Sequence, residues 1–311
     1  MTTLKPPALR SGDLIGIVSP ASPVDDNAKI EKGVRYLEGL GYRTLVGGNA
    51  YERNGYLAGS DEQRVEDLHK MFLHKDVRAI ISVRGGYGTP RLLSLLDYSI
   101  IRRNPKVLVG FSDITALQCA IWKHVRMITF HGPMLASDMA DNIDPFTEEM
   151  FWRHVSSPKS LGSICFSETE ASPLKSGRVK GILLGGNLSL LVNMLGTPHC
   201  PSFQKTILFV EEVGEEPYRI DRMLVQLRES RIMDKASGFL AGQFADCLPK
   251  DSKPSSSVSD LLEEWSASSK KPFLSNLPFG HVPRKLTIPV GLEATLDAGR
   301  RKLTFTQSAV C

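Results

Sequence analysis

Residues 106–117 of the chain read Lys106-Val107-Leu108-Val109-Gly110-Phe111-Ser112-Asp113-Ile114-Thr115-Ala116-Leu117. The apolar run stops at Gly110, and Ile114 and Leu117 then recur at the spacing of one helix face. A buried strand, a tight turn and a helix together form the repeating unit of parallel sheets that are covered by helices. The stretch therefore predicts an α/β fold with Ser112 at the carboxyl edge of the sheet, where open α/β sheets bind their ligands.

The same alternation runs through the first half of the chain. Apolar runs at 14–18, 42–46, 77–83 and 106–109 predict strands, and helical spacing predicts helices over 27–40, 60–72, 90–96 and 113–124. Either Ser60 or Asp61 can cap the second helix. This order predicts a mostly parallel sheet with helices on both faces.

The pattern changes near Val155, and 156–160 is expected to be a linker or crossover. Beyond it, strands are predicted at 178–184, 206–210, 238–244 and 286–296, with a helix over 219–229 and a polar surface loop over 252–259. We therefore expect two domains, 1–158 and 159–311, of which the second is an α+β domain richer in strands.

Composition narrows the class of protein. Of 311 residues, 41% are hydrophobic and 23% charged, which is ordinary globular usage. A net charge of +4 is too small to favour nucleic acid or an anionic membrane as a partner. The first residues have no leader-like apolar core, and no apolar run has the length of a membrane span, so a soluble cytoplasmic protein is predicted.

Ser112 has two interpretations. The helix that follows it offers free backbone N–H groups and a positive dipole end, which are the components of an oxyanion hole beside a nucleophile. Serine is also a preferred helix cap, and the turn lacks the G-x-S-x-G pattern of α/β-hydrolases. The motif alone favours the cap.

A glycine-rich segment, Arg84-Gly85-Gly86-Tyr87-Gly88, follows the third predicted strand. It lacks the Lys-Ser/Thr of a P-loop and the spacing of a dinucleotide motif, so a plain glycine turn is the better explanation than a nucleotide site. Neighbouring strand ends lie together, however, so the segment is a reasonable second wall of an oxyanion hole beside Ser112.

Two features of the second half complete a catalytic set. Glu211, in Phe209-Val210-Glu211-Glu212, adjoins an apolar strand and is a candidate for orienting an imidazole. His281, in Phe279-Gly280-His281-Val282-Pro283, stands between glycine and proline and suits a general base, with His131 and His199 as competitors. Five cysteines without a C-x-x-C pair, and no histidine cluster of metal spacing, predict no metal and no cofactor.

Together these segments resemble the L,D-carboxypeptidase family of serine peptidases, the muramoyl-tetrapeptide carboxypeptidases. The resemblance spans nearly the whole chain. It includes Val18-Ser19-Pro20, Leu57-Ala58-Gly59-Ser60, Arg84 to Gly88, Gly110 to Asp113, His131-Gly132-Pro133-Met134, Gly185-Gly186-Asn187-Leu188-Ser189, Glu211-Glu212 with Tyr218, Asp221-Arg222, and Phe279 to Pro283.

The resemblance implies a triad of Ser112 as nucleophile, His281 as general base and Glu211 as the residue that orients it. It also implies an oxyanion hole formed by the backbone N–H groups of Gly86 and Asp113. The family usually has Glu-Asp where this chain has Glu211-Glu212, and Glu211 aligns with the family's glutamate. Further residues expected to bind substrate are Arg84, Tyr87, Gly186, Asn187 and Arg222.

The family's fold is a flavodoxin-like N-terminal domain followed by a β-rich C-terminal domain, commonly in a homodimer. Its reaction removes the terminal D-alanine from peptidoglycan tetrapeptides during wall recycling. Two alternatives stay open: a peptidase like the microcin-immunity proteins, which cleave peptide–nucleotide conjugates, and a non-catalytic module that binds a muropeptide or nucleotide.

Overall fold

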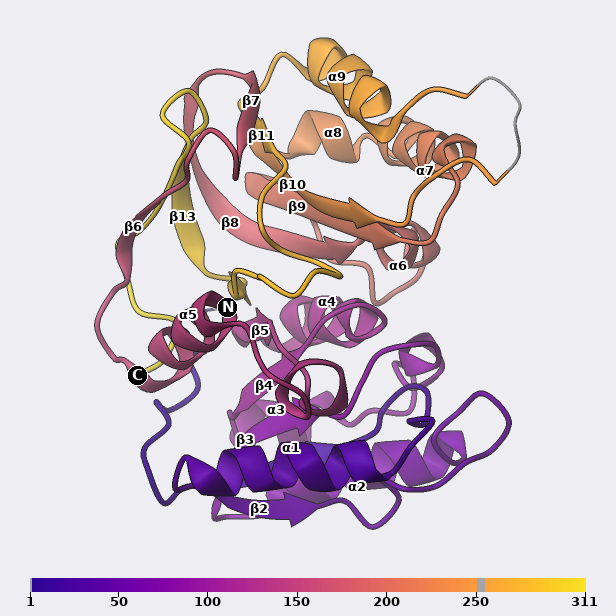
Figure 1. Ribbon diagram of the computed structural model, residues 1–311, viewed down its shortest axis with the longest axis vertical. Helices are drawn as coiled ribbons and strands as arrows, with labels where there is room; N and C mark the ends of the chain where they lie inside the picture. The colour runs from indigo at the N-terminus through magenta and orange to yellow at the C-terminus, as the bar shows by residue number, and fades with distance from the viewer. Residues whose placement is uncertain (1, 251–254) are drawn as a thin grey trace. The chain divides into compact units, whose positions relative to one another are not determined.

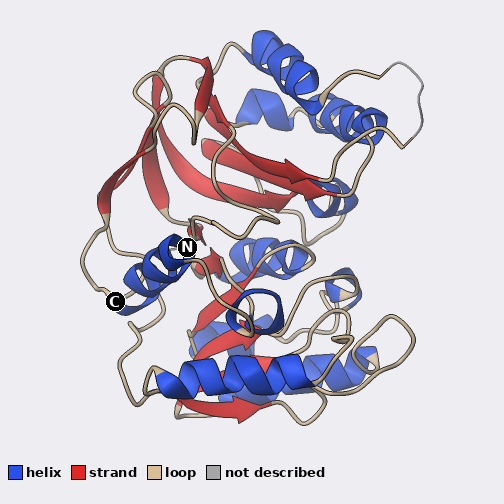
Figure 2. Ribbon diagram, viewed as in Figure 1, coloured by secondary structure: helices blue, strands red, loops and turns tan. Residues whose placement is uncertain are grey.

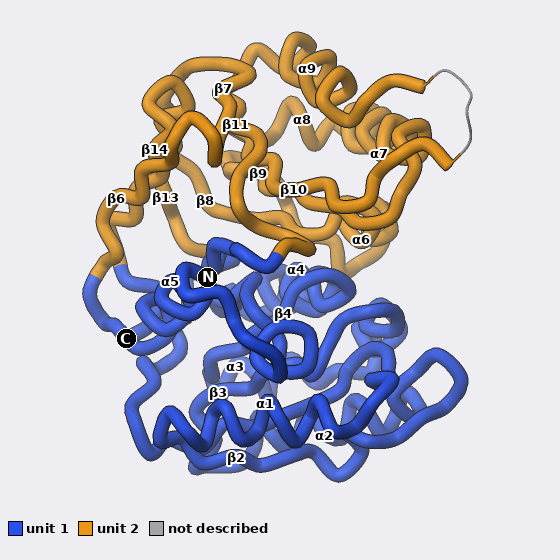
Figure 3. Tube along the Cα trace, in the orientation of Figure 1, with its two compact units in different colours: residues 1–159, 283–291, 308–311 blue, residues 160–282, 292–307 orange. Residues whose placement is uncertain are grey.

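The computed structural model describes residues 2–250 and 255–311, and these form two compact units (Figure 3). Unit 1 comprises residues 1–159, 283–291 and 308–311, and unit 2 comprises residues 160–282 and 292–307. Along the chain, unit 1 first gives way to unit 2 after residue 159, one residue beyond the expected boundary after residue 158. The sequence did not indicate that two later segments return to unit 1.

Unit 1 is built on a six-stranded sheet in the order β12-β5-β4-β3-β1-β2. The strands are β1 (Leu14–Val18), β2 (Arg43–Val46), β3 (Val77–Ser82), β4 (Val107–Gly110), β5 (Thr129–His131) and β12 (Ile288–Val290). The first five pair in parallel in the flavodoxin order 2-1-3-4-5, whereas β12 adds to β5 in the antiparallel sense. This confirms the expected fold class.

Helices cover both faces of this sheet (Figure 1). They are α1 (Ala28–Gly39), α2 (Asp61–Leu73), α3 (Tyr98–Arg103), α4 (Ile114–Val125) and α5 (Pro145–Ser156), with a 3₁₀ turn η1 (Thr89–Arg91) and a π-helical turn η2 (Leu135–Met139). Helices α1 and α5 are joined by a hydrogen bond from the Tyr36 hydroxyl to Glu148, and α2, α3 and α4 pack in succession. The apolar faces of α2 to α4 bury residues such as Leu68, Ile101 and Leu117 against β3 and β4.

Local signals explain where these helices begin. The Ser60 hydroxyl accepts a hydrogen bond from the Gln63 N–H while the Gln63 side chain accepts one from the Ser60 N–H, so Ser60 rather than Asp61 caps α2. The helix expected over 90–96 is wrong. Only η1 and a turn form there, and the next helix begins after its own cap, Asp97.

Unit 2 contains an eight-stranded mixed sheet in the order β6-β14-β13-β8-β9-β10-β11-β7. Strands are drawn in red in Figure 2. Strands β8 to β11 pair in parallel, and the remaining strands are antiparallel to their neighbours. The elements are β6 (Gly162–Cys165), β7 (Ser172–Lys175), β8 (Arg178–Asn187), β9 (Thr206–Val213), β10 (Gly238–Ala245), β11 (Phe273–Ser275), β13 (Glu293–Asp297), β14 (Lys302–Phe305), α6 (Leu188–Asn193), α7 (Pro217–Glu229), α8 (Ile232–Lys235) and α9 (Val258–Ser269). The expected strand-rich α+β character is confirmed.

The polar loop expected over 252–259 is only partly tested. Residues 252–254 lie outside the described part of the chain, and α9 begins at Val258 after its cap Ser257. Among the described residues, no helix combines the length and the apolar character required to cross a membrane.

The single strand expected over 286–296 is also wrong. The chain bends at Gly291, so β12 pairs with β5 in unit 1 while β13 pairs with β8 in unit 2. Gly291 has a φ of +95°, and a Cβ atom built there would lie 2.4 Å from the Trp122 ring. Glycine is required at this bend because any side chain would be strained and would clash.

We expect Gly291→Ala to lower the free energy of unfolding by about 2–5 kcal/mol, from left-handed strain and overpacking against Trp122. The matched control is Gly12→Ala, where φ is +86° but no atom lies within 4 Å of the added Cβ. That control isolates the backbone cost, about 1–2 kcal/mol. Urea unfolding of both variants measures the difference, and equal losses would contradict the proposed clash.

Candidate active site

Ser112 occupies the turn between β4 and α4 in unit 1. Its φ is +63°, in the left-handed region that non-glycine residues rarely adopt. The residue at the N-cap of α4 is Asp113, and no side chain caps this helix, so the hydroxyl of Ser112 does not perform the capping role. A strained, half-buried serine between a strand and a helix is the backbone arrangement that exposes a nucleophile in α/β enzymes.

The glycine-rich segment lies directly against this serine. A Cβ atom at Gly85 would stand 2.8 Å from the Ser112 Cβ, so only glycine allows the two segments to approach so closely. Ser22 fixes the next turn, because its N–H donates to the Gly85 carbonyl and its hydroxyl accepts from the Tyr87 N–H. The structure therefore brings Ser112 and the glycine loop together within unit 1.

Two backbone N–H groups border Ser112 without an internal partner. Neither the N–H of Gly86 nor that of Asp113 donates a hydrogen bond to any described residue. Backbone N–H groups beside a nucleophile are the usual donors to a developing oxyanion. The arrangement can thus stabilise negative charge on a substrate oxygen.

Glu211 and His281 form a close pair in unit 2. The Nδ1 atom of His281 lies 2.7 Å from Oε2 of Glu211; the glutamate side chain is fully buried and the imidazole is 22% exposed. Gly280 makes this contact possible, because its φ is +103° and a Cβ atom there would lie 2.7 Å from the same carboxylate oxygen. Buried Phe279 anchors the loop against Phe209 of β9.

Glu212 points to the other side of β9, as successive strand residues must. Its carboxylate accepts hydrogen bonds from the Asn187 amide at 2.8 Å, and from the Ser189 N–H at 2.8 Å and the Ser189 hydroxyl at 2.6 Å. Burial raises the pKa of this carboxyl group, and these hydrogen bonds oppose the rise. Glu212 therefore fixes the start of α6, whereas Glu211 is the carboxylate that contacts His281.

Known proteins similar to this chain show which family it belongs to. A model of the LD-carboxypeptidase N-terminal domain matches residues 15–132, and a model of the LD-carboxypeptidase C-terminal domain matches residues 180–296. A probable murein peptide carboxypeptidase of Bacillus subtilis is 38% identical over 307 residues, which cover 96% of this chain and 92% of the relative. The chain belongs to the LD-carboxypeptidase family.

Solved structures agree with this membership. The muramoyltetrapeptide carboxypeptidase of Oxalobacter formigenes has a TM-score of 0.84 and 33% identity, covering 93% of this chain and 97% of that one. The microcin C7 self-immunity protein MccF has a TM-score of 0.91 and 26% identity, covering 99% of this chain and 100% of that one. Another structure of MccF is a complex with aspartyl sulfamoyl adenosine. As a member of the LD-carboxypeptidase family, this chain is a serine carboxypeptidase, a hydrolase.

The competing histidines have other surroundings in this LD-carboxypeptidase. His131 is buried at the end of β5, where it pairs with Ile288 of β12 and its ring centroid lies 5.7 Å from that of Phe111. His199 lies between α6 and β9, and burial lowers its pKa. His281, by contrast, contacts the carboxylate of Glu211.

The residues expected to bind substrate are divided between the units. In unit 1, the Arg84 guanidinium donates to the Pro23 carbonyl at 3.3 Å, while the Tyr87 side chain is 47% exposed. In unit 2, Asn187 is buried and engaged with Glu212 and the Leu190 N–H. Gly186 has a φ of +142° at the end of β8, and the Arg222 guanidinium lies 5.5 Å from the centre of the exposed Tyr218 ring.

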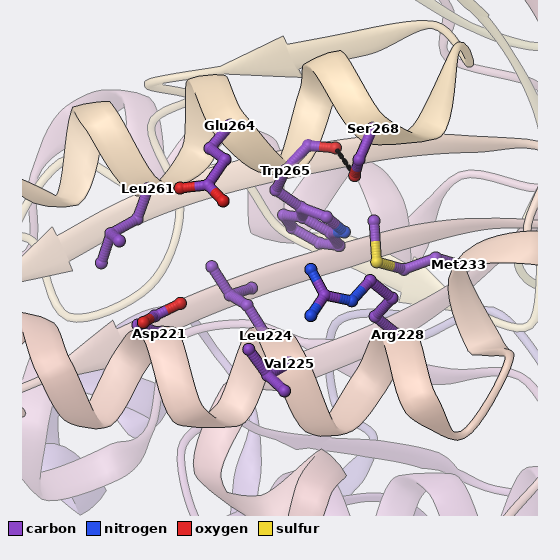
Figure 4. A pocket seen from close by; sticks show the side chains of 9 residues that line it. All are labelled: Asp221, Leu224, Val225, Arg228, Met233, Leu261, Glu264, Trp265 and Ser268. Atoms are coloured by element: carbon purple, nitrogen blue, oxygen red, sulfur yellow. Dashed lines mark hydrogen bonds between the residues drawn. The ribbon is translucent and has the colours of Figure 1, made fainter.

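A small cavity in unit 2 lies apart from all of these residues (Figure 4). It has a volume of about 40 Å³ and lies between α7 and α9, where Trp265 and Arg228 project into it. This is enough space for one or two waters. Neither Glu211 nor His281 lines it, so it is not the candidate active site.

Sequence reasoning missed several residues that shape the site. Ser22 and Thr89 bind the two ends of the glycine loop, and the Asp113 side chain accepts from Thr89. Thr89 stands immediately after Gly88, and this adjacency was the only available signal.

Proposed function

We propose that this LD-carboxypeptidase releases the terminal D-alanine from murein tetrapeptides through a triad of Ser112, His281 and Glu211. The observation that carries the proposal is the left-handed backbone of Ser112, bordered by two N–H groups that have no partner among the described residues. Strain of this kind persists only where the surrounding structure holds it, and it concentrates at active sites. The names of the relatives supply the substrate class.

The chemistry follows from the atoms that each residue offers. Glu211 engages Nδ1 of His281, which assigns proton transfer to Nε2. His281 takes the proton of Ser112 as the serine oxygen attacks the carbonyl of the diamino acid. The Gly86 and Asp113 N–H groups stabilise the resulting oxyanion, at about 3–4 kcal/mol for each donor.

Collapse of the tetrahedral intermediate breaks the peptide bond. His281 gives its proton to the departing nitrogen of D-alanine, and an acyl-enzyme on Ser112 remains. Water, deprotonated by the same imidazole, then releases the tripeptide and restores the serine. No other reactant is needed, so the proposal requires neither metal nor cofactor.

The proposed triad takes Ser112 from unit 1 and His281 from unit 2. Directly after Val282 the chain enters unit 1, where β12 pairs with β5, and β5 pairs with Gly110 at the end of β4. The segment that carries His281 thus continues along the chain into β12, the strand next to β5.

A second candidate is hydrolysis of a peptide–nucleotide conjugate. It is favoured by the TM-score of 0.91 to MccF over 99% of this chain. Identity favours the first candidate, because the murein peptide carboxypeptidase is 38% identical and MccF 26%. The homodimer is expected from the family resemblance and the cytoplasmic location from the sequence pattern, and both stay predictions.

The direct test offers the purified protein the tetrapeptide L-alanyl-γ-D-glutamyl-meso-diaminopimelyl-D-alanine. We expect release of D-alanine and the tripeptide, measured by chromatography and mass spectrometry. A matched peptide that ends in L-alanine should resist cleavage, because it changes only the chirality of the leaving group. Cleavage of aspartyl sulfamoyl adenosine in place of the tetrapeptide would support the second candidate, and turnover of neither would contradict both.

A further inference from the structure

Thr89 donates two hydrogen bonds to Asp113, one to its side chain and one to its backbone. The Thr89 N–H donates to Oδ2 of Asp113 at 2.8 Å, and the Thr89 hydroxyl donates to the backbone carbonyl of Asp113. Both residues are buried, Thr89 completely and Asp113 to 1% exposure. Two hydrogen bonds to different oxygens of Asp113 fix the distance and the angle between the two segments, which one bond does not.

These segments are the ones that carry the two candidate oxyanion donors. Thr89 ends the loop that contains Gly86, and Asp113 supplies its own backbone N–H as the other donor. The second contact between the segments is the close approach of Gly85 to Ser112. The loop therefore contacts the nucleophile turn on both sides of Gly86. One contact is between Gly85 and Ser112, and the other is between Thr89 and Asp113.

A buried cation supports the far end of the loop. The side chain of Arg64 is fully buried in α2, where it donates to the Pro20 carbonyl at 2.7 Å and pairs with Asp61. Gly88 packs on its guanidinium so closely that a Cβ atom there would lie 2.5 Å from Nη1. Burial raises the pKa of Asp113, while hydrogen bonds from Thr89 and Gly88 and the positive charge of Arg64 oppose the rise.

We infer that Thr89 and the Asp113 carboxylate are positioning residues that set the separation of the Gly86 and Asp113 N–H groups. The inference rests on the proposed nucleophilic role of Ser112 and extends it. An oxyanion hole is effective only when its donors are already placed where charge develops. Displacement of the loop is therefore expected to weaken stabilisation of the transition state more than binding of the substrate in its ground state. Displacement of a catalytic group by about 1 Å can cost about 10²-fold in rate.

The test begins with Thr89→Val, which keeps the shape of the side chain and removes the hydroxyl donor. We expect kcat for D-alanine release to fall about 10–100-fold with KM within about threefold, because the loss falls on the transition state. Thr89→Ser restores the hydroxyl and should recover kcat to within about threefold of the unmodified protein. Asp113→Ala removes the other half of the pair and leaves the backbone donor in place.

The two residues should act as a unit. The double variant of Thr89→Val with Asp113→Ala is expected to lose no more activity than the worse single variant, whereas independent residues would give multiplied losses. The matched control is Asp97→Ala, which removes a comparable bond at the start of α3, where the Ser99 N–H donates to the Asp97 carboxylate at 2.8 Å. It should lower the Tm without changing kcat.

A readout independent of turnover separates this inference from the proposed function. Amide hydrogen exchange should accelerate in Thr89→Val over residues 84–89 and 110–114. Unchanged exchange in both segments, or an unchanged kcat, would overturn the positioning role. Absence of D-alanine release by the unmodified protein would overturn the proposed function instead, and the exchange result would still decide whether Thr89 holds the loop.

Discussion

Replacing Ser112 with alanine is expected to lower D-alanine release by about 10⁴–10⁶-fold, the cost of removing a serine nucleophile from a triad. The fold should persist, because the hydroxyl does not cap α4. The measurement is single-turnover release of D-alanine from the tetrapeptide, with circular dichroism to verify the fold. Full activity in this variant would contradict the triad.

The same position offers a second measurement that does not involve catalysis. Ser112 holds a φ of +63°, which costs a residue with a Cβ atom about 1–2 kcal/mol. Ser112→Gly and Ser112→Ala both lack the nucleophile, but only glycine relieves the strain. We expect the glycine variant to be more stable than the alanine variant by about 1 kcal/mol, as a nucleophile turn under strain predicts. Equal stability would show that the turn stores no strain.

The second large effect is expected for Glu211→Gln, which should lower kcat by about 10³–10⁴-fold. The carboxylate accepts the Nδ1–H of His281, so Nε2 is left as the base. An amide NH₂ in its place favours the opposite tautomer, in which Nε2 already carries a proton and cannot accept one from Ser112. The check is kcat and KM for the tetrapeptide, with KM expected to change little.

Glu212→Gln is the matched control on the neighbouring residue. It makes the same chemical change, but Glu212 binds Asn187 and Ser189 rather than His281. We expect this variant to lose about 1–3 kcal/mol of stability, since a buried acceptor of several hydrogen bonds is weakened, and to keep kcat within about tenfold. If Glu212→Gln instead abolished turnover and Glu211→Gln did not, the assignment of the orienting carboxylate would be reversed.

Much of the fold could be predicted from local patterns. The apolar runs at 14–18 and 106–109 correspond to β1 and β4. They could be predicted because each apolar run is followed by a segment with the spacing of an amphipathic helix. One error arose where distant contacts overrode the local signal: Gly291 divides an apolar run between two sheets. The helix expected over 90–96 is reduced to η1 and a turn.

The candidate site likewise includes features that local sequence patterns predict and features that depend on distant contacts. Placement after an apolar strand made Glu211 a candidate, and glycine and proline neighbours made His281 one, while their proposed roles came from the family resemblance. The motif around Ser112 favoured a cap, because a positive φ on a serine cannot be read from sequence; it exists only through Gly85 and the surrounding packing. The Thr89–Asp113 pair was also hidden, since it joins residues 24 positions apart.

The route of the chain has a consequence for the order in which the protein is made. Unit 1 contains most of the early residues, yet it also requires β12 and residues 308–311, where the Cys311 carbonyl accepts from the Ala8 N–H. Synthesis reaches these pieces only after residues 160–282 of unit 2. Domains generally fold as they emerge, the earliest first. Here the first unit to emerge is the last to be completed, and a gene cut after residue 159 encodes a sheet that lacks its edge strand.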